Sequence, residues 1–182
     1  AERPSEEAVA RYNATTEAAF SGVHDFPKPT IAMIRGYCIG GGMALATCCD
    51  MRIATPGSKF GIPAAKLGLG YDQKGVRRLM NVVGPSFAKE IFFTARQFDA
   101  EEARMMGLAN RVVPLAELEG YVTKYAATIA ANAPLTIEGT KFIVGEALKD
   151  ESKRDVAACA AAVDRCFQSA DYKEGRRAFM EK

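Results

Sequence analysis

Histidine is scarce in this sequence, with one residue in 182, and this scarcity limits the chemistry open to the chain. A metal site built on histidine, or a Ser-His-Asp triad, would have to use His24. His24 lies in the polar stretch GVHDFPKP, whose composition is typical of a surface connection. We therefore expect His24 to be a surface residue without a catalytic role, and we predict no metal site.

Paired cysteines, long apolar runs and an excess of one charge are also missing. The five cysteines are an odd number and none has CxxC spacing, which indicates reduced thiols in the cytoplasm or a similar compartment. No window approaches 18 consecutive apolar residues, so no membrane span is expected. The 24 basic and 22 acidic side chains are interspersed, so nothing favours nucleic acid or an acidic membrane as a partner. The composition is that of a soluble globular chain of one domain, or of one domain with an appendage.

The most informative stretch begins with a predicted strand at Ile31 to Ile34, where apolar residues follow two prolines. After Gly36, we expect Tyr37 and Cys38 to line a turn that leads to the triplet Gly40-Gly41-Gly42. Helix-forming residues follow the triplet at once, so a short buried helix is expected from Met43. A strand that breaks on glycines and opens a helix presents backbone N–H groups at one spot, which suits an anion or a developing oxyanion.

Three blocks of sequence carry a close resemblance to a known family. They are GYCIGGGMALATCCDMRIA, then FGIPAAKLGLG, then YKEGRRAFMEK, and they resemble the crotonase (enoyl-CoA hydratase/isomerase) superfamily from about Ala8 to Lys182. The resemblance implies an α/β fold, a spiral of ββα units with a C-terminal helical trimerisation region. It places a partial spiral core at residues 1–113 and the helical region at 114–182. Relatives carry a leading segment of strands that is not found in these residues, so we expect an N-terminally truncated chain.

The resemblance also implies the substrate and the residues that bind it. The substrate would be an acyl-CoA thioester, with CoA as part of the substrate and no separate cofactor. Gly41 would supply one oxyanion-hole N–H to the thioester carbonyl, and Gly40, Met43 and Ala64 would lie along the substrate. Lys66 would either face a phosphate of CoA or be a solvated lysine. The expected assembly is a homotrimer or a dimer of trimers, and the basic residues of the last block resemble a region that contacts CoA across a subunit boundary.

The two glutamates that hydratases of the family use as acid and base are replaced by alanine. They correspond to Ala44, two residues after the triplet, and to Ala64, directly after the proline of the FGIP block. A methyl group neither accepts nor donates a proton, so glutamate-dependent hydration is not expected. The sequence therefore predicts either a different chemistry or none.

Tyr71 and Asp72 are the remaining candidates for chemistry. Tyr71 resembles a tyrosine of methylmalonyl-CoA decarboxylases, where it would position the departing carboxylate while the oxyanion hole holds the enolate. Asp72 aligns with an aspartate that is an acid/base in dienoyl-CoA isomerases and a nucleophile in aryl-CoA dehalogenases. The alternative is structural: Gly70 to Asp72 forms a turn, and Asp72 caps the helix that begins at Gln73.

We favour a lyase or isomerase that acts through a thioester enolate, with decarboxylase-like chemistry. Two alternatives stay open. One is an isomerase or dehalogenase that depends on Asp72, and the other is a CoA-thioester-binding protein that has lost catalysis.

The rest of the sequence predicts short helices and strands. Ser5 is expected to cap a helix that ends near Gly22, and Arg77 and Arg78 are expected to be surface charges. From Pro114 onward only helices are predicted, and they are too few to bury their own apolar stripes. The further expected strands are Asp50 to Ala54, Ser58 to Phe60 and Leu108 to Val113, and the further helices are Gly75 to Val83, Phe87 to Thr94, Ala100 to Met106, Leu115 to Asn132, Leu135 to Leu148, Glu151 to Phe167 and Tyr172 to Glu181.

Overall fold

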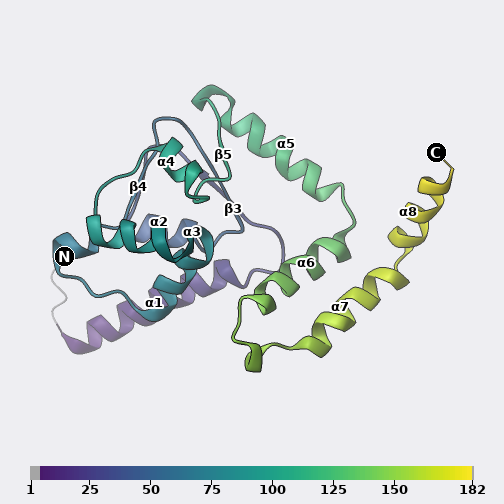
Figure 1. The fold of residues 1–182 in the computed structure, drawn as a ribbon, viewed down its shortest axis with the longest axis horizontal. Coiled ribbons are helices and arrows are strands. Elements are labelled where there is room, and N and C mark those ends of the chain that lie inside the picture. Colours follow the sequence, from purple (N-terminus) through teal and green to yellow (C-terminus); the bar gives the residue numbers. More distant parts are fainter. Residues whose placement is uncertain (1–4, 182) are drawn as a thin grey trace. The chain divides into compact units, whose positions relative to one another are not determined.

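The structure is a computed structural model that describes residues 5–181 and falls into two compact units. The first unit contains the described residues up to Phe26 together with Thr30–Val122, and the second contains Pro27–Pro29 and the residues from Thr123 onward. Figure 1 shows the order of the elements along the chain.

The first helix, α1 (Glu6–His24), begins as its sequence predicts. The side chain of Ser5 accepts a hydrogen bond from the N–H of Ala8 at 3.1 Å, and two glutamates occupy the positively polarised first turn. The helix continues past the expected end near Gly22, so His24 is its last residue rather than part of a loop. His24 is exposed, as expected.

Two small parallel sheets form the centre of the first unit. The strands β1 (Ile31–Ile34), β3 (Met51–Ala54) and β5 (Arg111–Val112) pair in the order β1-β3-β5, with Ile31 opposite Met51 and Ile53 opposite Arg111. The strands β2 (Tyr37–Ile39) and β4 (Lys59–Gly61) form the second sheet.

Two expectations about strands were wrong. Tyr37 and Cys38 do not form a turn, because they pair with Lys59 and Phe60 of β4. The expected strand at Leu108 to Val113 is shorter, because only Arg111 and Val112 pair with β3. In both segments the outcome depends on a distant partner strand, which local composition does not reveal.

Helices surround these sheets within the first unit. They are α2 (Gly41–Ala46), the 3₁₀ turn η1 (Pro63–Leu67), α3 (Gln73–Thr94) and α4 (Ala100–Met105). α3 replaces two predicted helices, since the chain bends at Gly84 (φ 76°, ψ 168°) and resumes helical geometry at Pro85. α4 begins with a capping box in which Asp99 and Glu102 satisfy each other's backbone N–H groups.

The core of the first unit lies between the strands, α2, α3 and α4. The largest fully buried side chains there come from elements that are distant in sequence, which ties the unit together. These side chains are Met43, Ile53, Phe60, Leu79, Ile91, Phe98 and Leu108.

The chain continues through η2 (Leu115–Glu117) and α5 (Leu118–Ala130) to three helices of the second unit, α6 (Pro134–Ala147), α7 (Val156–Gln168) and α8 (Ala170–Met180). α6 and α7 pack closely where the bare backbone of Gly139 faces Ala162. The predicted helix from Glu151 splits into η3 (Glu151–Lys153) and α7, because Asp155 caps α7 through the N–H of Ala158.

As expected, the second unit leaves large apolar side chains uncovered. Phe179 and Met180 are 79% and 83% exposed, and Val156 is 70% exposed. Helices this short bury too little apolar surface among themselves to hide these side chains.

Candidate active site

The glycine turn between β2 and α2 is the predicted centre of the site, and its backbone explains the glycines. Gly40 adopts φ 56° and ψ −117°, a conformation that side-chain-bearing residues rarely adopt. Its N–H donates to the carbonyl of Gly61 at 2.8 Å, which extends the β2–β4 pairing by one residue. Gly40 therefore turns the chain, and its N–H is already occupied within the fold.

Gly41 is the first residue of α2 and presents its backbone outward. The first N–H groups of a helix have no acceptor within the helix, so they are available to an external acceptor. Gly41 and Gly42 are both exposed, and a Cβ built on either meets no atom within 4 Å. The approach to these N–H groups is open, which suits the carbonyl oxygen of a ligand.

The C-terminal end of α2 is closed. Its last carbonyls accept hydrogen bonds from backbone N–H groups of Thr47, Cys48 and Cys49. The hydroxyl of Thr47 donates to the Ala44 carbonyl at 2.8 Å. The carbonyls at the C-terminal end of α2 thus have hydrogen-bond donors within the protein, whereas the N–H groups at its N-terminal end are exposed.

The other predicted binding residues differ in how far they are buried. Met43 is fully buried in the core, and Ala64 is 5% exposed in η1. The carbonyl of Ala64 accepts the N–H groups of Gly68 and Leu69, which shapes the loop that follows. Lys66 is exposed on η1, where it is free to reach a polar ligand or solvent.

Tyr71 lies in an extended loop before α3, and the expected turn at Gly70 to Asp72 is not formed. The Tyr71 ring packs edge-on against Phe92, with ring centroids 4.9 Å apart, and joins the margin of the core. Burial raises the pKa of the Tyr71 phenol above its ordinary value, and the nearby charge of Asp72 raises the pKa further. Tyr71 is therefore neutral at neutral pH, and its hydroxyl has a proton to donate to a ligand.

Asp72 caps α3, as the structural alternative predicted. One carboxylate oxygen accepts the N–H of Gly75 at 2.6 Å, and the backbone of Asp72 is extended. The side chain of Asp72 is exposed. Its role as a cap is confirmed, and a catalytic role would be additional to it.

Gly75 leaves room for Tyr71. A Cβ at Gly75 would lie 3.1 Å from one ring carbon of Tyr71 and 3.3 Å from the nearer carboxylate oxygen of Asp72. We predict that Gly75→Ala displaces the Tyr71 ring and lowers turnover about tenfold or more, since small misplacements at a site cost that much. The matched control is Gly120→Ala in α5, where a Cβ meets nothing within 4 Å. Steady-state kinetics of both variants test this prediction, and unchanged turnover in Gly75→Ala would contradict it.

An ion-pair cluster that sequence reasoning missed links α1 to the start of α3. Glu17 contacts Lys74 and Arg78, each at 3.1 Å, and the hydroxyl of Ser21 adds hydrogen bonds. The hydrogen bond from Arg78 is the main reason that the pKa of Glu17 falls to about 2. The Arg78 side chain is only 12% exposed, so the expectation that it is a surface charge was wrong. No local sequence pattern reveals the pairing of Glu17 with Arg78, because these two residues lie 61 positions apart in the chain.

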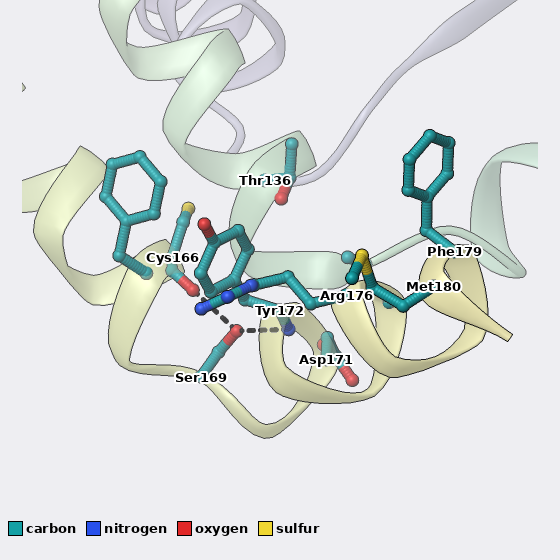
Figure 2. A pocket seen from close by; sticks show the side chains of 11 residues that line it. Thr136, Cys166, Ser169, Asp171, Tyr172, Arg176, Phe179 and Met180 are labelled. Carbon is teal, nitrogen blue, oxygen red and sulfur yellow. Dashed lines mark hydrogen bonds between the residues drawn. The ribbon is translucent and has the colours of Figure 1, made fainter.

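Each of the two units contains a hollow. The first, about 670 Å³, lies at the carboxyl ends of β1, β3 and β5 and is lined by Arg35, Gly36, Thr55, Pro56, Gly57, Pro114 and Leu115. The second, about 560 Å³, lies between α6, α7 and α8, where the Ser169 hydroxyl joins the carbonyl of Cys166 to the N–H of Tyr172 (Figure 2). Arg176 of the basic C-terminal block lines the second hollow, with its guanidinium 5.9 Å from the Tyr172 ring centre.

Within residues 5–181, no group of three or more histidine, cysteine, aspartate and glutamate side chains is placed to hold a metal ion. No helix among the same residues is both long and apolar enough to cross a membrane.

Comparison with solved structures defines the class of fold. An enoyl-CoA hydratase/isomerase family protein from Hyphomonas neptunium superposes with a TM-score of 0.87 at 35% identity, covering 97% of this chain and 67% of that chain. An enoyl-CoA hydratase/carnithine racemase from Magnetospirillum magneticum gives a TM-score of 0.86 at 33% identity, covering 98% and 66%. The parallel strands and the glycine turn into α2 therefore belong to an α/β protein of the crotonase-like fold.

The family follows from the sequence as a whole. All 182 residues match the family model described as enoyl-CoA hydratase/isomerase, and the chain belongs to this family of the crotonase superfamily. The crotonyl-CoA hydratase of Syntrophomonas wolfei is 37% identical over 171 residues, covering 94% of this chain and 66% of the relative. The Delta(3,5)-Delta(2,4)-dienoyl-CoA isomerase of Dictyostelium discoideum is 35% identical over 170 residues, covering 91% and 57%. The chain thus spans less than two thirds of the length of these curated relatives.

Proposed function

We propose that the protein is an acyl-CoA lyase or isomerase that acts through a thioester enolate, with decarboxylase-like chemistry. The observation that carries this proposal is the open backbone at Gly41, in a chain that has Ala44 and Ala64 at the positions of the two glutamates. In this proposal the Gly41 N–H binds the oxygen that becomes negative when the enolate forms. Neither alanine offers a proton-transferring group, so the chemistry proposed needs an oxyanion hole and no glutamate base.

Tyr71 supports the choice of decarboxylation over hydration. Loss of carbon dioxide from a malonyl-type thioester breaks a C–C bond, and its electron pair becomes the enolate that the Gly41 N–H stabilises. The departing carboxylate needs a neutral donor that holds it out of the thioester plane. We assign this role to the Tyr71 hydroxyl, which is neutral at neutral pH and whose pKa burial raises further.

The relatives support the substrate class. Their names specify crotonyl-CoA, dienoyl-CoA and carnitinyl-CoA as the compounds on which they act. All three are CoA thioesters, and we extend this shared class to the present protein. The proposal concerns the whole protein that contains this chain.

Assembly into a homotrimer, or a dimer of trimers, is part of the proposal. It is supported by the apolar side chains that the second unit leaves uncovered, Phe179 and Met180 above all. Contact with another copy of the chain would remove such side chains from water.

The test follows the mass of a panel of thioesters, including methylmalonyl-CoA and crotonyl-CoA, incubated with the full-length protein. We expect methylmalonyl-CoA to lose carbon dioxide and Tyr71→Phe to lower this rate about 10²–10⁴-fold, the range for a positioned acid or donor. Tyr71→Phe keeps the ring that packs on Phe92, so a fall in rate reports the hydroxyl alone. Addition of water to crotonyl-CoA would contradict the argument from the two alanines.

A second candidate is an isomerase that uses Asp72, which the similarity to the dienoyl-CoA isomerase favours. Asp72→Asn separates the two roles of this residue, because asparagine caps a helix about as well as aspartate but cannot act as a base. Loss of isomerase activity in Asp72→Asn with unchanged thermal stability would support the second candidate. Tight binding of every thioester with no change in mass would instead indicate a binding protein without catalysis.

A further inference from the structure

A buried arginine lies behind α2 and plays no part in the function proposed so far. Arg52 of β3 is 4% exposed. Its Nε donates to the carbonyl of Leu108 at 2.6 Å, and one terminal nitrogen donates to the carbonyl of Cys49 at 2.7 Å and to that of Ala46 at 3.3 Å. Among the described residues, these hydrogen-bond partners of the guanidinium are all backbone carbonyls.

A buried cation whose hydrogen bonds go to neutral carbonyls is unusual and calls for an explanation. The carboxylate of Asp50 acts on Arg52 through its charge and not through one of these hydrogen bonds. Removing a charge from water is costly unless hydrogen bonds replace the lost hydration. The three carbonyls supply those bonds, and an arginine stays charged in a protein interior. An apolar side chain of similar volume would avoid the cost of the charge but would leave the carbonyls of Leu108, Ala46 and Cys49 without this donor, so the guanidinium has a consequence for the segments that carry them.

The position of the carbonyls indicates that consequence. Ala46 is the last residue of α2, and Cys49 follows the helix within one turn. Arg52 therefore holds the negatively polarised end of the helix whose positive end carries Gly41. A helix of six residues is about 9 Å long, so the guanidinium charge lies close enough to act on both ends.

We propose that Arg52 is a positioning residue for the oxyanion site: it anchors the C-terminal end of α2, and its charge strengthens the positive potential at the Gly41 N–H. The charge neutralises the negative end of the helix dipole, so an oxyanion at the other end meets a more favourable field. The anchoring keeps the N–H groups in the first turn of α2 at a fixed position relative to the carbonyl oxygen of the substrate. The proposal rests on the function proposed above, because it assumes that Gly41 binds a carbonyl oxygen.

The test compares Arg52→Met with Asn110→Ala in the full-length protein. Asn110 is a matched control, because its side chain accepts the backbone N–H of Arg52 at 2.8 Å but does not touch the guanidinium. Both substitutions weaken the same part of β3, and only the first removes the charge and the bonds to α2.

The first readout is the carbonyl stretching frequency of a bound arylacryloyl-CoA thioester, recorded by infrared difference spectroscopy. We expect the wild-type protein and Asn110→Ala to lower this frequency equally, and Arg52→Met to lose at least half of the shift. Arg52→Lys, which keeps a cation, should restore most of it. A wild-type shift in Arg52→Met would overturn the electrostatic part of the proposal, as would a loss of the shift in Asn110→Ala equal to that in Arg52→Met.

The second readout, hydrogen exchange of residues 44–49, needs no ligand. We expect these amides to exchange about tenfold faster in Arg52→Met than in Asn110→Ala, and equal rates would overturn the anchoring. If Arg52→Met does not fold, the exchange rates of Arg52→Lys test the anchoring instead. A single ammonium group cannot reproduce the three hydrogen bonds of the guanidinium, so we expect faster exchange in this variant. Exchange at the wild-type rate in Arg52→Lys would overturn the anchoring. If the wild-type protein binds no thioester, the proposed function fails together with the electrostatic part, and exchange alone still decides the anchoring.

Discussion

Gly41→Pro is expected to lower turnover of an acyl-CoA substrate about 10²–10³-fold, the usual effect of removing one oxyanion-hole donor. Proline has no N–H, and Gly41 is the first residue of α2, a position where proline fits helical geometry. The substitution therefore deletes the proposed donor and preserves the helix. The measurement is kcat on the substrate that the thioester panel identifies, together with the circular dichroism of the variant.

Gly41→Ala is the matched control for this result. It keeps the N–H, and the added Cβ meets no protein atom within 4 Å, so the fold should accept it. We expect Gly41→Ala to raise KM by crowding the ligand while it keeps far more of kcat than Gly41→Pro. Equal losses of kcat in the two variants would show that the N–H of Gly41 is not the important group.

Phe60→Ala is expected to cause the largest loss of stability, about 3–5 kcal/mol for removal of a fully buried aromatic ring. Phe60 of β4 is 1% exposed, and its backbone exchanges two hydrogen bonds with Phe98, at 2.9 and 2.8 Å. A single domain is commonly stable by only about 5–15 kcal/mol, so the variant should approach the limit of folding. Denaturant unfolding of the two proteins measures the difference.

Phe93→Ala tests whether burial is the cause. Phe93 of α3 is the same residue type and is 76% exposed. We expect its removal to change stability by less than about 0.5 kcal/mol, as is usual for a surface position. A loss in Phe93→Ala as large as in Phe60→Ala would mean that this face of α3 is covered in the whole protein.

The sequence predicted best the features that depend on neighbouring residues. The strand at Ile31 to Ile34 is confirmed with its exact bounds, and the helix caps at Ser5 and Asp72 are both present. Each of these features is determined within a few residues of chain, by apolar runs or by a side chain that reaches the next turn. The glycine triplet was also interpreted correctly as the start of a helix, although the helix begins at Gly41 rather than Met43.

Features that depend on distant partners could not be predicted in this way. The strand at Tyr37 to Ile39 exists because β4 lies beside it, and its length gives too few residues for an alternating pattern to show. The burial of Arg78 depends on Glu17, and that of Arg52 depends on carbonyls up to 56 residues away. Sequence alone treats such arginines as surface charges, because most arginines are exposed.

At the proposed site, the sequence identified the residue types but not their surroundings. It selected Tyr71 and Asp72 as candidates and included the Asp72 cap as the structural alternative, and the structure adds that the Tyr71 ring packs against Phe92. It placed Met43 along the substrate, whereas the structure buries the Met43 side chain completely. The contact of Tyr71 with Phe92 does not follow from a motif, since Phe92 lies near the other end of α3.

The break at Gly84 divides α3 into two helical segments. The first segment starts at the cap Asp72, directly after Tyr71, and the second carries Phe92. The contact between the rings of Tyr71 and Phe92 therefore links the start of the first segment to the second. The angle that the chain adopts at Gly84 thus helps to determine where the Tyr71 hydroxyl, the proposed donor, points.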